Sequence, residues 1–176
     1  MSIKSLRLFF GLPLPHRQAD AIDAWRNGLG LDGRLVARRN LHLTLAFLGS
    51  QPVERLEELQ QLAGRIRLEG FELKLDRLEA GRHGLVSLGT SQSPEALLQL
   101  AGELHRILRS AGYALDERVF WPHLTLARDC RKRPLPDRPP NFSWMAECFV
   151  LFHSTSDEQG TVYHPLFHWP LAMPGL

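Results

Sequence analysis

The chain has 176 residues, of which 44% are hydrophobic and 23% charged, with a formal net charge of +2. This length gives a single domain room for a sizeable core. The longest apolar stretches are interrupted by His, Thr, Gly or Pro well before the ~18 residues that a membrane span needs, which excludes a membrane-spanning protein. Residues 1–14 lack the long apolar segment and the small-residue cleavage site of a signal peptide.

The cysteine content indicates the cellular compartment of the protein, and the arginine content indicates the charge of its substrate. Cys130 and Cys148 have neither metal-ligand spacing nor a dense disulfide pattern, so we expect a reducing cytoplasm. The chain holds 18 arginines against 3 lysines. Arginine grips phosphate with a planar, bidentate fork, so this bias favours an anionic substrate. A GC-rich genome enriches arginine without any function and is the favoured explanation, so the support for an anionic substrate is mild.

The first half of the chain reads as two strand and helix pairs. The predicted elements are a buried strand Leu6–Leu12 ended by Pro13, a helix Arg17–Leu29, a polar connector Leu31–Asn40, a strand Leu41–Leu48 ended by Gly49, and a helix from Val53 to about Arg67.

The second half adds strands on either side of one long helix. The pattern predicts a half-exposed strand Phe71–Asp76, a strand Leu85–Leu88 ended by Gly89, a helix with Ser93 as N-cap that stops at Gly112, a strand Val119–Ala127, a loop Arg131–Asn141, and a hairpin of Cys148–Phe152 with Thr161–Phe167. This order indicates an α+β fold of mostly antiparallel sheet with flanking helices. We expect residues 1–176 to form one domain of two pseudo-symmetric lobes with a cleft between them.

One four-residue sequence occurs twice, as His42-Leu43-Thr44-Leu45 and as His123-Leu124-Thr125-Leu126, 81 positions apart. Side chains alternate between the two faces of a strand, so each histidine shares a face with its threonine while the leucines share the other. We therefore expect each copy to bury its leucines and to present an imidazole and a hydroxyl toward an opening.

Two such strands face to face would place two imidazoles and two hydroxyls around one cavity, which suits acid–base chemistry on a phosphate. Histidine serves as either acid or base because its usual pKa of ~6.5 lies near neutrality. The motifs are identical, so the residues alone leave open which histidine is which. Thr44 and Thr125 are predicted donors to the non-bridging oxygens. Arg128, five residues after His123, is the predicted phosphate clamp.

These motifs and their flanks resemble the 2H phosphoesterase superfamily, and within it the bacterial RNA 2′,3′-cyclic phosphodiesterases, also named 2′-5′ RNA ligases. The similarity covers nearly the whole chain. It rests on the segments 7–12, 40–49, 122–128, 160–163 and 169–171. One His-x-Thr-x motif is common by chance, whereas two copies at this separation with these flanks are specific.

The resemblance implies hydrolysis of a 2′,3′-cyclic phosphate at an RNA 3′ end, tRNA fragments included, to a 2′-phosphomonoester. It also implies the reverse joining of RNA ends through a 2′-5′ bond. By the family's pattern His42 is the proton donor to the leaving 3′ oxygen and His123 the acceptor from water, without metal or cofactor. We expect a monomer that does not bind membranes. Arg39 departs from the acidic residue common in relatives, which changes the local charge expected at the cleft rim.

Other readings remain open. Two further functions are a phosphodiesterase of 2′-5′ oligoadenylates or small cyclic nucleotides and a non-catalytic module that binds RNA ends. Phe10 is a candidate for stacking on a base, although a core role is as reasonable. His153-Ser154-Thr155-Ser156 also fits the motif. Its x positions are polar serines, which are not expected to be buried as the motif leucines are, so it is rejected as a third motif. His105 lies off the apolar stripe of its helix and is expected in solvent. The remaining histidines lack ligand partners, so no metal site is predicted.

Overall fold

The structure, a computed structural model, describes residues 4–175 of the chain. The strands are β1 (Ser5–Pro13), β2 (Arg34–Leu35), β3 (His42–Pro52), β4 (Phe71–Leu75), β5 (Arg77–Ala80), β6 (Val86–Gly89), β7 (His123–Arg128), β8 (Phe142–Ala146), β9 (Cys148–Asp157) and β10 (Gly160–Pro170). The helices are α1 (His16–Asn27), α2 (Leu56–Ala63) and α3 (Glu95–Ser110), with short 3₁₀ turns at Arg38–Asn40, Val53–Arg55 and Arg82–Gly84.

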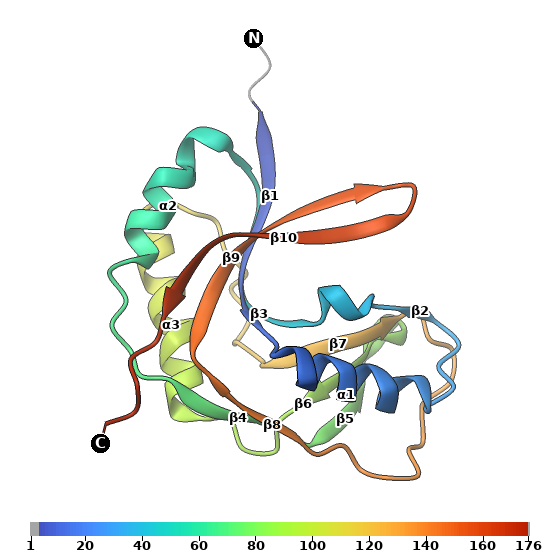
Figure 1. The fold of residues 1–176 in the computed structure, drawn as a ribbon. Coiled ribbons are helices and arrows are strands. Elements are labelled where there is room, and N and C mark those ends of the chain that lie inside the picture. Colours follow the sequence, from blue (N-terminus) through green and yellow to red (C-terminus); the bar gives the residue numbers. More distant parts are fainter. Residues whose placement is uncertain (1–3, 176) are drawn as a thin grey trace.

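Eight of the described strands form one curved antiparallel sheet in the order β10-β9-β1-β3-β7-β6-β5, with β2 also paired to β7 (Figure 1). The strands β4 and β8 form a separate antiparallel pair. In Figure 1 the helices α2 and α3 lie side by side on one flank of the sheet, and α1 lies apart from them near β7 and β8. The predicted α+β fold of mostly antiparallel sheet is therefore confirmed.

The two lobes meet where β3 pairs with β7. The only register pair described between these strands is Leu43 with Leu124, which hold the same position in the two copies of the repeated sequence. The β3 side carries β1, β9 and β10, and the β7 side carries β6, β5 and β2. An approximate two-fold axis thus passes through the Leu43–Leu124 pair and relates the lobes.

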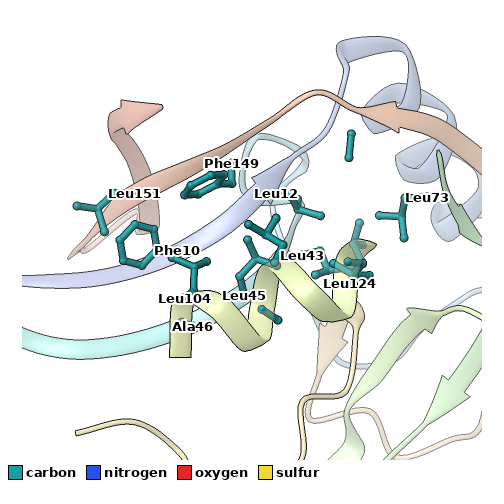
Figure 2. Close-up of a cluster of buried hydrophobic side chains, with 14 of the residues drawn as sticks. Phe10, Leu12, Leu43, Leu45, Ala46, Leu73, Leu104, Leu124, Phe149 and Leu151 are labelled. Carbon is teal, nitrogen blue, oxygen red and sulfur yellow. The ribbon is translucent and has the colours of Figure 1, made fainter. Parts of the chain in front are cut away.

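The apolar core lies on the face of the sheet that the motif leucines share. Leu43 and Leu124 are fully buried, and Leu104 of α3 packs in the same cluster. Figure 2 shows this cluster, with Phe10 and Phe149 on the β1 and β9 side and Leu73 of β4 on the other. Burying a large apolar side chain contributes about 1.5–3 kcal/mol, so the leucines hold the register that sets the opposite face.

Both motif strands contain a β-bulge, an extra residue relative to the partner strand, at the same position of the motif. In the pairing of β1 with β3, Phe10 pairs with Ala46 and Gly11 with Thr44, which leaves Leu45 unpaired. In the pairing of β6 with β7, Val86 pairs with Ala127 and Ser87 with Thr125, which leaves Leu126 unpaired. Such a bulge bends the strand and changes which face the following residues point to.

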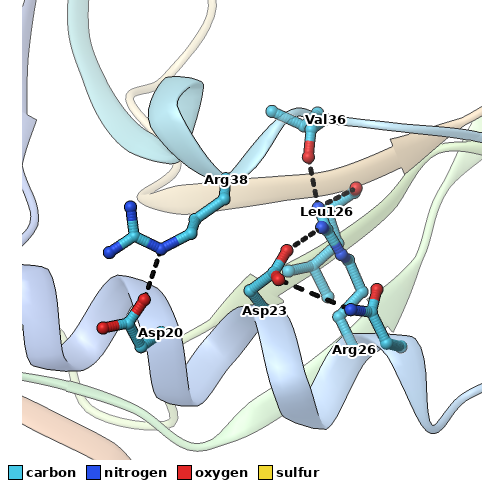
Figure 3. A network of polar contacts seen from close by, with 7 residues as sticks. Asp20, Asp23, Arg26, Val36, Arg38 and Leu126 are labelled. Carbon is cyan, nitrogen blue, oxygen red and sulfur yellow. Dashed lines mark hydrogen bonds and ion pairs between the residues drawn. The ribbon is translucent and has the colours of Figure 1, made fainter.

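The backbone carbonyl of each bulge accepts a side-chain hydrogen bond. His105 Nε2 donates to the Leu45 oxygen at 3.0 Å. The guanidinium of Arg26, only 3% exposed, donates to the Leu126 oxygen at 3.3 Å and to the oxygen of Val36. Asp23 pairs with Arg26 on α1 (Figure 3). The Leu126 oxygen also accepts from the Val36 backbone N–H at 2.9 Å. A buried unpaired carbonyl costs about 1–3 kcal/mol, so the His105 contact stabilises the bulge at Leu45. The expectation that His105 lies free in solvent is therefore wrong.

Several elements differ from the sequence prediction. The short strands β2, β5 and β8 were not predicted, and β2 lies inside the segment expected as a connector. The helix expected from Val53 to Arg67 begins as a 3₁₀ turn and ends at Ala63, where Gly64 follows. Ser93 is not the cap of α3, because Pro94 occupies the N-cap position and no side chain caps the helix. Within residues 4–175, no helix is both long and apolar enough to cross a membrane.

Candidate active site

A cavity of about 920 Å³ opens on the face of the sheet opposite the leucines, and the predicted site residues of both motifs line it. His42, Thr44, His123, Thr125 and Arg128 all line it. The Leu43–Leu124 register explains this, because antiparallel pairing sets His42 across from Thr125 and Thr44 across from His123. The two histidines are then diagonal neighbours, a relation that corresponds to about 7–8 Å between backbones. That separation leaves room for one phosphate group between the rings.

His42 begins β3 and is held by two hydrogen bonds. Its Nδ1 lies 2.6 Å from the backbone oxygen of Asn40, and its Nε2 lies 2.9 Å from Thr44 Oγ1. A carbonyl oxygen only accepts, so Nδ1 carries the proton and Nε2 of the neutral ring accepts from the threonine hydroxyl. Rings of Phe9 and Tyr163 pack on the imidazole, with centroids 4.8 and 5.0 Å away.

Burial of His42 among these rings lowers its pKa to about 4. The hydrogen bond to the Asn40 oxygen opposes this shift, while the positive charges of His123 and Arg128 add to it. In the unliganded cleft at neutral pH His42 is therefore neutral. An anion in the cleft would favour its protonated form.

His123 begins β7 and is oriented in the same way. Its Nδ1 lies 2.9 Å from the backbone oxygen of Trp121, again the residue two positions earlier, so Nε2 is left free as an acceptor. The indole of Trp121 stacks on the imidazole with centroids 4.4 Å apart and planes 20° apart, and it is 46% exposed at the cavity. The two histidines thus make equivalent Nδ1 hydrogen bonds, each to the backbone oxygen two residues earlier, and these bonds select the same tautomer in both.

Arg128 ends β7, and none of the ion pairs found in residues 4–175 includes it. By simple alternation from Thr125 it would point to the core, but the bulge at Leu126 returns it to the cleft face. The nearby Arg34, its register partner on β2, is paired with Asp129 at 2.7 Å. Arg128 is thus available to an anion in the cavity.

Phe10 cannot stack on a base, so this prediction is wrong. Its side chain is 0% exposed and packs in the core against Phe149 and Trp169. Its neighbour Phe9 points to the other face and lines the cavity beside His42. Adjacent strand residues face opposite ways, and the alternation of Leu6, Leu8, Phe10 and Leu12 along this strand already places Phe10 on the apolar face.

Of the other histidines in the described residues, His105 lines the cavity, where its Nε2 donates to the Leu45 oxygen, and the rest do not line it. His153 lies on β9 opposite His164 of β10 and does not line the cavity. His164 Nε2 lies 2.9 Å from Thr155 Oγ1. Among the described residues, no three His, Cys, Asp or Glu side chains gather in a way that could hold a metal ion.

Asn40 is a site residue whose role the sequence reasoning missed. Its side chain is 6% exposed, donates to the oxygen of Thr161 at 2.7 Å and accepts from the Tyr163 backbone N–H at 3.2 Å. It thereby ties β10 to the start of β3 and places Tyr163 against His42. The signal available in the sequence was an Asn directly before the apolar run Leu41–Leu48.

Comparison with known proteins places this constellation in a family. The model of the 2′-5′ RNA ligase superfamily matches residues 13–144, more than half of the chain and both motif copies. The chain belongs to this superfamily. It is 42% identical over 173 residues to the RNA 2′,3′-cyclic phosphodiesterase of Escherichia coli K12, which covers 94% of this chain and 96% of that protein. The Thermus thermophilus protein of the same name is 32% identical over 180 residues, or 90% of this chain and 86% of the relative.

Solved structures of the superfamily share the fold at full length. The crystal structure of E. coli LigT complexed with 3′-AMP superposes with a TM-score of 0.89 at 40% identity, covering 96% of this chain and 99% of LigT. The same protein has been solved complexed with phosphate, at a TM-score of 0.86 and 38% identity over 97% of this chain and all of LigT.

Proposed function

We propose that this member of the 2′-5′ RNA ligase superfamily hydrolyses 2′,3′-cyclic phosphates at RNA 3′ ends to 2′-phosphomonoesters. The observation that carries the proposal is the Leu43–Leu124 register, which aims two histidines and two threonines from opposite lobes at one cavity. The relatives named RNA 2′,3′-cyclic phosphodiesterase and the LigT complexes with 3′-AMP and phosphate support it.

In this proposal the two histidines transfer the protons of the reaction. His123 Nε2 takes a proton from water as the water oxygen bonds to phosphorus. The bond from phosphorus to the 3′ oxygen breaks, and His42 Nε2–H gives its proton to that oxygen. Thr44, Thr125 and Arg128 stabilise the charge on the non-bridging oxygens. Because the pKa of His42 is about 4 in the unliganded cleft, the substrate's negative charge is what favours the protonated donor.

The test of this function uses an RNA oligomer ending in a 2′,3′-cyclic phosphate, incubated in excess EDTA. We expect turnover to the 2′-phosphate, identified by mass and by phosphorus NMR. An otherwise identical oligomer ending in a 3′-phosphate serves as the unreactive control. Binding of the cyclic end without turnover would favour a non-catalytic module, and turnover abolished by EDTA would point to a metal enzyme. Preference for a 2′-5′ oligoadenylate would assign a different substrate.

Replacing Arg128 tests the phosphate clamp. We expect Arg128→Ala to lower kcat/KM about a hundredfold and Arg128→Lys about tenfold, because lysine keeps the charge but loses the bidentate fork. The alanine variant should also raise the pKa of His42, since the Arg128 charge lowers it. The control is Arg34→Ala, whose side chain pairs with Asp129 and does not line the cavity. Equal losses in the Arg34 and Arg128 variants would contradict the assignment.

We also propose that the protein works as a monomer in the cytoplasm, on RNA ends such as those of tRNA fragments. Both motif copies that line the cavity come from one chain, which supports a monomer. Cys130 and Cys148 are free thiols, which fits a reducing compartment. Light scattering on the purified protein, with and without RNA, measures the oligomeric state.

A further inference from the structure

The strands β5 and β6 carry polar side chains on the cleft face beside the second motif strand (Figure 1). Directly opposite residues of antiparallel strands point to the same face, and successive residues of one strand to opposite faces. One row of register partners across β7, β6 and β5 packs on the core: Leu124, Leu88 and Leu78. The two rows on either side of it therefore lie on the cleft face, and they are His123, Gly89 and Arg77, and Thr125, Ser87 and Glu79.

Gly89 leaves a space beside His123 that the side chain of Glu79 fills. A β-carbon at Gly89 would lie 2.8 Å from Glu79 Oε1 and 3.1 Å from Glu79 Oε2. The β-carbons of directly opposite residues are about 4.5–5.5 Å apart, and Gly89 is directly opposite His123. The carboxylate of Glu79 therefore lies at the flank of His123, although it does not line the cavity.

Glu79 brings a negative charge that no ion pair neutralises. None of the ion pairs found in residues 4–175 includes it, and its Oε2 is buried without a hydrogen-bond partner among these residues. Burial raises the pKa of this carboxyl, and the positive charges of Arg77 and His123 oppose the shift. Such coupling is reciprocal, so the carboxylate stabilises the charged form of His123 as that charge stabilises the carboxylate.

No other carboxylate is in a position to do this. In the part of the chain that the structure describes, Asp116 is the only carboxylate that lines the cavity, and it is paired with Arg118 at 2.5 Å. The other titratable groups that line the cavity are His42, His105, Tyr163, Arg7 and Arg128. Glu79 is therefore the unpaired negative charge closest in the sheet to His123.

In the proposed hydrolysis, His123 takes the proton of water and becomes positively charged as the water oxygen bonds to phosphorus. We propose that Glu79 is a positioning residue for this step: its carboxylate, held over Gly89, stabilises the imidazolium of His123 and so strengthens that imidazole as a base. This inference rests on the proposed function. No proton passes to Glu79, which acts through His123 alone.

The first measurement follows the protonation of His123 itself, by NMR titration of ring resonances assigned with His123→Gln. We expect Glu79→Gln to move the titration midpoint of His123 about 0.5–1 pH unit toward acid, because the amide keeps the shape and loses the charge. For a 2′,3′-cyclic nucleotide at pH 7, kcat should fall about three- to tenfold with KM unchanged within about twofold. Glu72→Gln changes an exposed glutamate of β4 outside the cavity and is the matched control.

A second variant moves the carboxylate without removing it. In Gly89→Ala the added methyl group takes the space that Glu79 fills, so the flexible side chain of Glu79 must turn away. We expect this variant to move the His123 midpoint and lower kcat as Glu79→Gln does. In a chain that already carries Glu79→Gln, Gly89→Ala should add little. Losses in kcat that multiply in the double variant would overturn the inference.

The outcomes separate this inference from the proposed function. A His123 midpoint that Glu79→Gln leaves in place overturns the inference, and so does a fall in kcat without that movement, because Glu79 would then act on the fold. An equal movement in Glu72→Gln overturns it as well, since any lost negative charge would have the same effect. Wild-type protein that hydrolyses no cyclic phosphate, with the midpoint moving as expected, ends the proposed function and leaves the coupling between Glu79 and His123 standing.

Discussion

Replacing either motif histidine by glutamine lowers kcat for a 2′,3′-cyclic nucleotide by about 10²–10⁴-fold, the usual contribution of one acid or base group. The result is expected because each imidazole moves one proton, and the amide of glutamine moves none. Both proton transfers belong to one transition state, so the double variant should be little slower than the slower single variant. The measurement is product formation in EDTA at pH 7.

Two controls keep this result interpretable. His168→Gln changes an exposed histidine of β10 that does not line the cavity, and it should retain full activity. Thermal unfolding of each variant shows whether the fold survives, which matters most for the half-buried His42. If His42→Gln and His123→Gln both keep more than a tenth of wild-type kcat while folded, the two-histidine mechanism is wrong.

The centre of the site follows from the sequence because period-two alternation is a local rule. Once Leu43 and Leu124 are assigned to the core, the faces of the flanking histidines and threonines are settled. The Nδ1 contacts could not be predicted, because the acceptors are backbone oxygens of residues as different as Asn40 and Trp121. Every residue type has a backbone oxygen, so the identity of the residue does not reveal which one accepts the hydrogen bond.

The bulges mark the second limit of sequence reasoning. Leu45 and Leu126 look like ordinary strand leucines, and their carbonyl oxygens accept hydrogen bonds from side chains 60 and 100 residues away, those of His105 and Arg26. Without the bulges, Phe47 and Arg128 would be assigned to the wrong face. The short strands β2 and β5 were missed for a related reason, since two to four partly exposed residues carry little periodicity and are held in place by neighbouring strands.

Acid should destabilise this protein through His42 in particular. The pKa of the ring is about 4 in the folded protein and near the ordinary 6.5 when the chain is unfolded, so between these values the unfolded chain binds more protons. Stability is therefore fully present above pH 6.5 and is lost as the pH falls toward 4. The shift corresponds to a loss of about 3 kcal/mol in the free energy of unfolding.

The measurement is urea unfolding of wild type and His42→Gln at pH 7 and at pH 4. Other groups titrate in both proteins and cancel in the comparison, so the fall in stability should be about 3 kcal/mol smaller in the variant. His16→Gln removes an exposed histidine of α1 and is the control for losing an imidazole as such. Inorganic phosphate should reduce the acid loss in the wild type, because an anion beside His42 stabilises the same charged ring that the proposed donor needs. An identical pH dependence in wild type and His42→Gln would mean that the ring is not held neutral by its aromatic surroundings.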